Sequence, residues 1–120
     1  MINSYKELKV WQRAMELVVA VYELTEKYAK EETYGLTAQT RRSVISIPSN
    51  IAEGRHRSTR KDFINFLIIA YASGAELETQ IEIAKRLPKT KQLNYVKVDN
   101  LLEEVMKMLN IMIKKLKASS

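Results

Sequence analysis

The sequence contains no cysteine, only three glycines, two prolines and a single histidine among its 120 residues. The absence of cysteine excludes a disulfide framework and thiolate metal sites, and it agrees with a reducing compartment such as the cytoplasm. The scarcity of glycine and proline argues against sandwiches and barrels, which need many tight turns. No stretch of about 18 apolar residues occurs, and the first residues lack a signal-peptide core, so we expect neither membrane insertion nor secretion.

The composition is that of a folded domain with a basic surface. Hydrophobic residues make up 46% of the chain and charged residues 28%, which is apolar enough for a core and unlike a disordered tail. At this length we expect a single domain over residues 1–120. The sequence has 20 lysines and arginines against 14 aspartates and glutamates, a formal net charge of +6. Such a charge favours polyanionic partners.

Apolar residues recur every three or four positions in four segments, the spacing typical of amphipathic helices. The predicted helices cover approximately residues 6–28, 36–54, 60–87 and 98–117. Four helices joined by short loops predict an all-α, antiparallel up-down four-helix bundle. The second and third segments carry apolar residues on more than one face, so we expect copies of the chain to cover one another's surplus apolar surface.

Two local signals refine these helices. Thr59 is the expected N-cap of the third helix, with Asp62 three residues on at the positive end of the helix dipole. Pro48 lies inside the second helix and lacks the N–H that would bond the Val44 carbonyl. A kink or break near Ile47 is therefore predicted.

The segment YGLTAQTRRSVISIPSNIAEG, from Tyr34 to Gly54, carries the most specific motif of the chain. The third segment continues the pattern with Phe63, Phe66, Leu67, Ala70, Ser73, Glu76 and Leu77. Together they resemble the four-helix bundle proteins encoded by intervening sequences of bacterial 23S ribosomal RNA genes, often called S23 ribosomal proteins. The resemblance covers roughly residues 5–88 closely and the last helix by pattern only.

This resemblance implies a homopentameric ring or barrel, of which the chain would be one protomer. It also implies kinship with the accessory variability proteins of diversity-generating retroelements, which share that barrel, bind nucleic acid and partner a reverse transcriptase. The partners it implies are copies of this chain, RNA or DNA, and a reverse transcriptase or another protein.

A basic cluster marks the start of the third helix, where Arg55, Arg57, Arg60 and Lys61 place four cations within seven residues. Backbone N–H groups at a helix start add to the attraction for phosphate, so this cluster is a candidate nucleic-acid contact. The alternative is a solvated basic turn that serves solubility alone.

A second basic group, which we expect near one end of the bundle, contributes Lys89 and Lys91 as further candidate nucleic-acid contacts. Its members are Lys85, Arg86, Lys89, Lys91, Lys97, Lys114, Lys115 and Lys117.

A polar stripe runs beside the apolar one on the second helix and could meet polar residues of the third. Its members are Gln39, Arg42, Ser46, Asn50 and Glu53, with Ser73, Glu76 and Gln80 opposite. One interpretation is a surface that faces nucleic acid. The other is a structural polar layer or subunit interface, with Arg42 paired to Glu53, Glu76 or a neighbouring subunit and Asn50 satisfying carbonyls that Pro48 leaves free.

Catalytic and metal signals are weak. Glu53 and His56 have the spacing used by di-iron bundles, but such a site needs two Glu-x-x-His pairs and the chain has one histidine. No nucleophile context, phosphate-cradling glycine loop or dinucleotide fingerprint is found. We therefore predict a non-catalytic, homo-oligomeric protein without metal or cofactor that contacts RNA or DNA phosphates. The alternative is a protein–protein scaffold ring with no nucleic-acid role.

Overall fold

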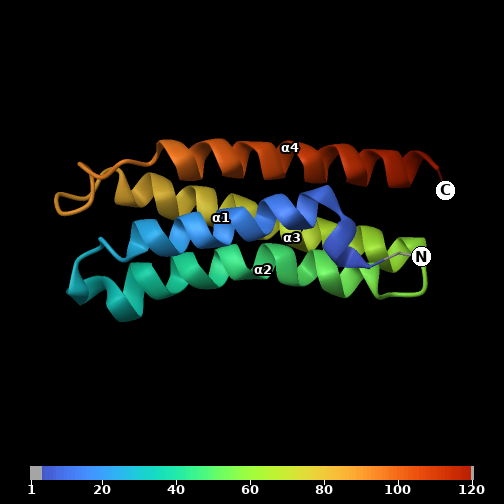
Figure 1. Ribbon diagram of the computed structural model, residues 1–120, viewed down its shortest axis with the longest axis horizontal. Coiled ribbons are helices and arrows are strands. Elements are labelled where there is room, and N and C mark those ends of the chain that lie inside the picture. Colours follow the sequence, from blue (N-terminus) through green and yellow to red (C-terminus); the bar gives the residue numbers. More distant parts are fainter. Residues whose placement is uncertain (1–3, 120) are drawn as a thin grey trace.

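The computed structural model describes residues 4–119, and the regular elements of this part of the chain are all helical. The four long helices are α1 (Lys9–Thr25), α2 (Ala38–Arg55), α3 (Arg60–Ala84) and α4 (Val96–Ala118). A 3₁₀ helix, η1 (Tyr5–Glu7), precedes α1, and two short turns, η2 (Lys30–Glu32) and the π-helical η3 (Thr33–Thr37), lead into α2. Successive helices run in opposite directions and form a rod of 48 × 23 × 20 Å (Figure 1). The predicted all-α, up-down four-helix bundle is confirmed.

Helices α1 and α3 each contact both α2 and α4, so the four helices surround one common core. The two chain ends and the α2–α3 turn lie at one end of the rod (Figure 1). The α1–α2 connection and the α3–α4 loop lie at the opposite end. We call the end with the α2–α3 turn the turn end and the opposite end the loop end. Charged residues can form one cluster only when they lie at the same end.

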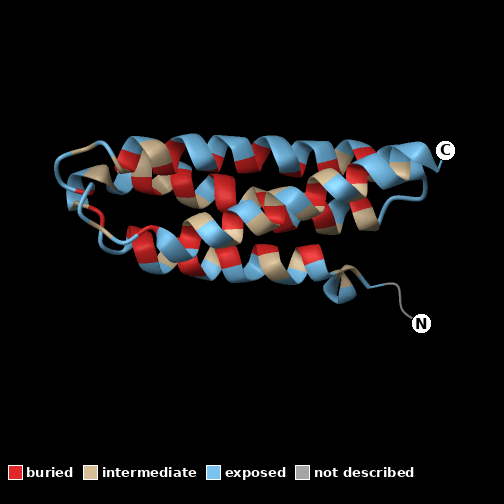
Figure 2. Cartoon of the chain, turned by 90° about the horizontal axis from the view of Figure 1, so that it is seen from above, coloured by how far each residue is buried: buried red, intermediate tan, exposed pale blue. Residues whose placement is uncertain are grey.

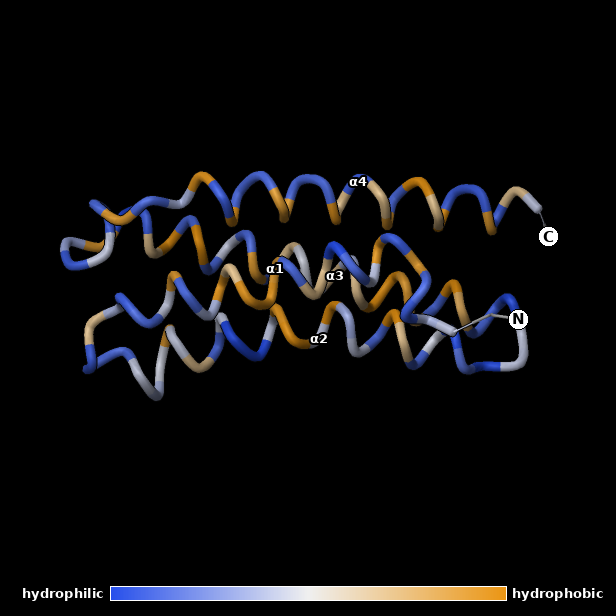
Figure 3. Tube along the Cα trace, viewed as in Figure 1, coloured by the Kyte–Doolittle hydropathy of each residue, from blue (hydrophilic) through white to orange (hydrophobic). Residues whose placement is uncertain are grey.

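The core lies along the axis of the rod. Leu17, Ile47, Leu67, Leu77 and Leu109 are fully buried, one or more from each long helix. Buried residues occupy the sides of the helices that face one another, and exposed residues face outward (Figure 2). In α4 most hydrophobic positions point towards the other helices and most hydrophilic ones point away (Figure 3), although Val96 and Ile111 are exposed. Within the described part of the chain, each helix is too short or too polar to span a lipid bilayer.

The helix ends differ from the predicted ones by a few residues. The first helix begins at Lys9 rather than at residue 6, because Leu8 is extended (φ −73°, ψ 125°) and separates η1 from α1. Gly35, with φ −105° and ψ −106°, breaks the helical path inside η3, so α2 begins at Ala38 rather than at residue 36. The third helix ends at Ala84, and the fourth begins at Val96.

Of the kink or break predicted near Ile47, the break is wrong, because α2 continues through Pro48 as one helix to Arg55. Pro48 is buried, and its packing offsets the hydrogen bond that it cannot donate. The side-chain amide of Asn50 donates to the Ser46 carbonyl at 2.8 Å, not to the Val44 carbonyl that the proline leaves without its usual donor.

Candidate nucleic-acid interface

The α2–α3 turn is held by its own hydrogen bonds. The backbone N–H of Arg57 donates to the Gly54 carbonyl at 3.1 Å and closes the end of α2. Thr59 Oγ1 accepts from the N–H of Asp62 at 3.1 Å, which confirms Thr59 as the N-cap of α3. These bonds fix the direction in which α3 starts at Arg60, so the basic residues on either side of the turn keep a defined arrangement.

Arg57 and Arg60, two of the predicted cations, make contacts that hold the turn end together. Arg57 Nη2 lies 2.7 Å from Glu53 Oε2, and its guanidinium sits over the Phe66 ring, 4.8 Å from the centroid. Arg60 Nη1 donates to the Ser119 carbonyl at 2.8 Å and thereby ties the end of α4 to the start of α3. Both guanidinium groups keep further N–H donors, since each has five.

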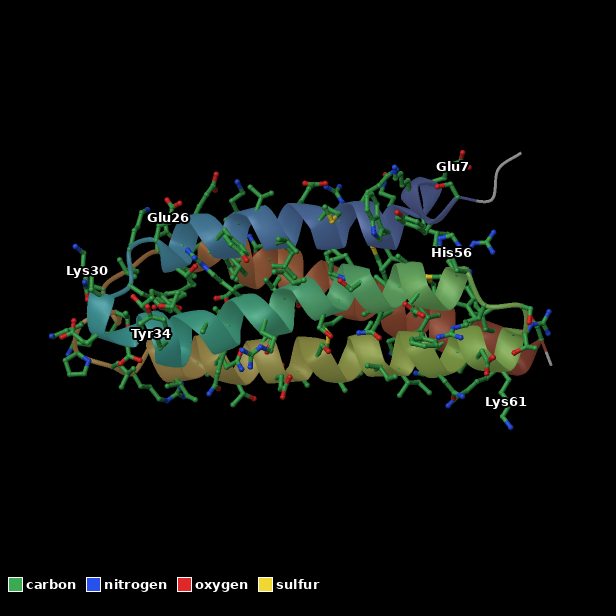
Figure 4. The ribbon with its side chains drawn as sticks, turned by 90° about the horizontal axis from the view of Figure 1, so that it is seen from below. Glu7, Glu26, Lys30, Tyr34, His56 and Lys61 are labelled. Carbon is green, nitrogen blue, oxygen red and sulfur yellow. The ribbon has the colours of Figure 1, made fainter. Side chains whose placement is uncertain are left out.

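A cavity of about 460 Å³ opens beside this turn between α3 and the end of α4. Its lining contains three cations, Arg60, Lys61 and Lys117, together with Ile64, Asn65 and Ile68. Lys61 is exposed and extends away from the bundle (Figure 4). Lys117 belongs with Lys89 and Lys91 in the second basic group predicted from the sequence. It lies at the turn end instead, because α4 runs back towards the start of α3.

Lys89 and Lys91 do not join this cluster. They lie in the α3–α4 loop at the loop end, where Figure 4 also shows Lys30 and Tyr34, whereas His56 and Lys61 lie at the turn end. Lys89 Nζ forms an ion pair with Glu31, and this hydrogen bond lowers the pKa of the Glu31 carboxyl and raises the pKa of Lys89. The expectation that the second basic group gathers near one end is therefore wrong.

The polar stripe joins α2 to α3. Ser46 Oγ and Ser73 Oγ lie 2.8 Å apart, and the Asn50 amide donates to Ser46 Oγ at 2.9 Å. Ser43, a buried member that sequence reasoning missed, donates to Glu76 Oε1 across a long 3.5 Å. The signal was available, since Ser43 lies three residues before Ser46 and so on the same side of the helix.

Arg42 does not form either of the ion pairs predicted for it within the chain. Glu53 is paired with Arg57 instead, and no described carboxylate lies within ion-pair distance of Arg42. The predicted intrachain pairs of Arg42 with Glu53 or Glu76 are therefore wrong. Arg42 is exposed and lies beside the polar stripe.

The single histidine makes an aromatic contact at the turn end. Its ring meets Tyr5 of η1 edge to face at 5.4 Å, and Tyr5 also meets Trp11 at 5.3 Å. Within residues 4–119, no three histidine, aspartate or glutamate side chains come together as metal ligands would. The geometry of the turn end is suited to holding an anion through arginine and lysine donors.

Comparisons with known proteins agree with this fold. The family model described as 23S rRNA-intervening sequence protein matches residues 6–111. The chain is also similar to a crystal structure from Bacteroides thetaiotaomicron of a protein with unknown function from the S23 ribosomal protein family. The two chains are 29% identical with a TM-score of 0.75, and the alignment covers 88% of this chain and 98% of that one. No curated protein matches the chain.

Proposed function

Because this chain belongs to the 23S rRNA-intervening sequence protein family, as its sequence motif predicted, we propose that it is a non-catalytic, homo-oligomeric protein that binds RNA or DNA through phosphate contacts. The observation that carries the proposal is the convergence of Arg60, Lys61 and Lys117 around one cavity at the turn end. Arg55 and Arg57 flank the same turn. The proposed location is the cytoplasm, where RNA and DNA are both accessible. Its reducing conditions prevent disulfide formation, and a chain without cysteine does not depend on disulfides.

The electrostatics of the turn end support phosphate as the ligand. Arginine and lysine side chains there stand next to the first turn of α3, where the N–H of Asp62 is bonded to the Thr59 cap and the N–H groups of Arg60 and Lys61 have no acceptor within the helix. Phosphate contacts of this kind position a nucleic acid and carry no base information. The proposed binding should therefore depend strongly on salt, because each phosphate contact releases counterions.

Two separate apolar surfaces support self-association. One is the groove between α1 and α2, a cavity of about 340 Å³ whose lining includes Trp11, Met15 and Ile45. The other is the outer side of α3, where Ile69 and Ile83 are 46% and 44% exposed. Exposed apolar surfaces of this kind mark interaction sites.

The two surfaces differ, so we infer a head-to-tail contact in which the α1–α2 groove of one copy receives the outer side of α3 of the next. Contacts of this type close into rings when the rotation allows. A ring of five is the number that the family resemblance implies, and it would repeat the basic turn end in every subunit.

The direct test is binding of a fluorescently labelled single-stranded RNA, followed by anisotropy over a range of salt concentrations. Changing Arg55, Arg57, Arg60 and Lys61 together to alanine should weaken binding at least about tenfold and make the log–log salt slope shallower by about 3, as expected for four lost contacts. Changing Lys30, Lys89, Lys91 and Lys97 to alanine removes the same charge at the loop end, so it is the matched control. We expect this control to weaken binding by less than about threefold.

Two outcomes would reject the basic turn as the phosphate site. Equal losses in both variants would mean that only the overall charge matters. Unchanged binding after the turn-end substitutions would place the contact elsewhere. A protein partner that stays bound after nuclease treatment and in high salt would favour a protein–protein scaffold.

A further inference from the structure

A second site lies on the same pair of helices, away from the basic turn. It is a polar groove of about 290 Å³ in the half of the α2–α3 pair nearer the loop end. Its lining consists of Gln39, Arg42, Ser43 and Ser46 from α2 and of Glu76 and Gln80 from α3. Figure 4 looks onto these two helices where they lie side by side. The volume is close to about 300 Å³, the lower limit for small-ligand pockets.

The groove contains a buried polar atom without a partner. Gln80 is only 9% exposed, and its Oε1 makes no hydrogen bond to any described residue. Buried side-chain oxygens normally accept a hydrogen bond, so one left open inside a groove indicates a place where a ligand can donate. Beside it, Ser43 makes only the long contact with Glu76, and Arg42 has no acidic partner among residues 4–119.

The charges across the groove restrict what it can hold. Arg42 on α2 and Glu76 on α3 carry opposite charges on its two sides. A phosphate would be repelled by Glu76, and an ammonium group would be repelled by Arg42. The fitting ligand therefore carries no net charge and presents hydrogen-bond acceptors on one side and donors on the other.

Among neutral ligands of this size, an unpaired nucleobase has such an edge, and guanine matches best. Its O6 and N7 accept from an arginine, a pairing that is common in specific recognition. Its N1–H and N2–H groups are adjacent donors that a carboxylate such as Glu76, together with the Gln80 oxygen, can accept. Adenine lacks the carbonyl oxygen, and cytosine and uracil lack two adjacent donors, so each of them leaves one side of the groove unmatched.

We propose that the groove of Gln39, Arg42, Ser43, Ser46, Glu76 and Gln80 binds an unpaired guanine base. The inference rests on the proposed nucleic-acid function and extends it. The turn end would bind phosphates, and the groove would recognise a base. Glu76 lies about 22 Å along α3 from Lys61, at 1.5 Å per residue. A few nucleotides of an extended single strand can span that distance.

The test uses nucleosides, which carry no phosphate and so leave the basic turn out of the assay. Guanosine, adenosine and cytidine are titrated separately into the full chain, and binding is followed by saturation-transfer NMR. We expect guanosine to bind at least tenfold more tightly than the other two. Glu76→Gln should remove this preference, whereas Glu78→Gln, the same change on the neighbouring groove between α3 and α4, should leave it intact.

Gln80→Leu separates a binding role from a structural one. If the Gln80 oxygen accepts a hydrogen bond from the ligand, the leucine variant should bind guanosine at least tenfold more weakly. Without ligand it should melt at a higher temperature, because a buried acceptor without a partner is removed. A lower melting temperature with unchanged guanosine binding would overturn the proposal.

Two further outcomes would also overturn it. The first is equal affinity for all three nucleosides. The second is a change of oligomer mass in Glu76→Gln without any nucleoside binding, which would assign the groove to a second copy of the chain. Loss of RNA binding in the turn-end variant reports on the phosphate site alone, so the two proposals can fail separately.

Discussion

Gly54 of α2 lies directly against Phe66 of α3. A Cβ atom placed on Gly54 would be 2.7 Å from Phe66 Cβ and 3.0 Å from Phe63 Cδ1. The Phe66 Cβ is attached to the backbone of α3 and cannot swing aside. The last turn of α2 can therefore approach α3 only with glycine at this position, and the basic turn of the candidate interface begins immediately after it.

Substitution of this glycine should be costly. Gly54→Ala gains helix propensity of about 1 kcal/mol, but it forces α2 away from α3, so we expect a net loss of about 1–3 kcal/mol in the free energy of unfolding. Urea denaturation at a fixed protein concentration measures it. Gly74→Ala is the matched control, because the added Cβ would meet the flexible end of Met106, which can move. Equal losses for the two variants would contradict this account of Gly54.

The fold followed from periodicity, but one residue with a strong local rule misled at the level of detail. Proline predicts a kink or break in a helix interior. Pro48 instead lies inside one continuous helix, where it is buried in the bundle, so packing outweighs the local preference. No property of the single sequence reveals this packing in advance. Gly54, where the predicted helix ends, lies one residue before the observed end at Arg55.

The candidate interface was only partly predictable. An up-down bundle brings residues near 60 and 117 together and sends residues near 90 to the far end. The grouping of Lys117 with Lys61, and its separation from Lys89, could therefore have been deduced from the topology. The choice of Glu53 could also have been deduced, because Arg57 lies four residues from it, whereas Arg42 lies eleven residues away, about 16 Å along the helix. The lack of a pair between Arg42 and Glu76 could not, because it depends on the side-chain geometry between two helices.

Two buried tyrosines at the loop end should affect stability differently. Tyr95 Oη donates to the Thr90 carbonyl at 2.8 Å. Tyr28 Oη is buried beside Tyr95 but is too poorly placed for a well-formed hydrogen bond to any described residue. Tyr95→Phe should therefore lower the free energy of unfolding by about 0.5–1.5 kcal/mol, and Tyr28→Phe should leave it unchanged or slightly higher. Urea denaturation at neutral pH compares the two. A larger loss in Tyr28→Phe would mean that its hydroxyl does form a hydrogen bond.

The same pair should make the protein sensitive to alkali. Burial raises the pKa of both the Tyr28 and Tyr95 phenols above the usual value of about 10. Above that pH the unfolded chain releases protons that the folded chain retains, so the free energy of unfolding falls as the pH rises towards the folded pKa values. Urea midpoints measured from about pH 8 to 11 should decline, and the decline should be shallower in Tyr28→Phe. Identical slopes in the two proteins would contradict a buried phenol at this position.

A head-to-tail assembly and a contact in which each surface pairs with its own copy predict different effects of single substitutions. Ile45→Lys places a charge in the α1–α2 groove and leaves the outer side of α3 intact, whereas Ile69→Lys does the reverse. A buried charge without a partner is costly, so each variant alone should dissociate to a chain mass of 13.9 kDa.

A one-to-one mixture of the two variants should then form a dimer, because the intact groove of one chain can receive the intact α3 of the other only once. Size-exclusion chromatography with light scattering measures both masses. Ile111→Lys on the exposed side of α4 is the control and should leave the wild-type oligomer unchanged. If each surface paired with its own copy, every single variant would keep one dimer contact, and mixing would add no new species. A wild-type chain that stays monomeric at micromolar concentration would reject both arrangements.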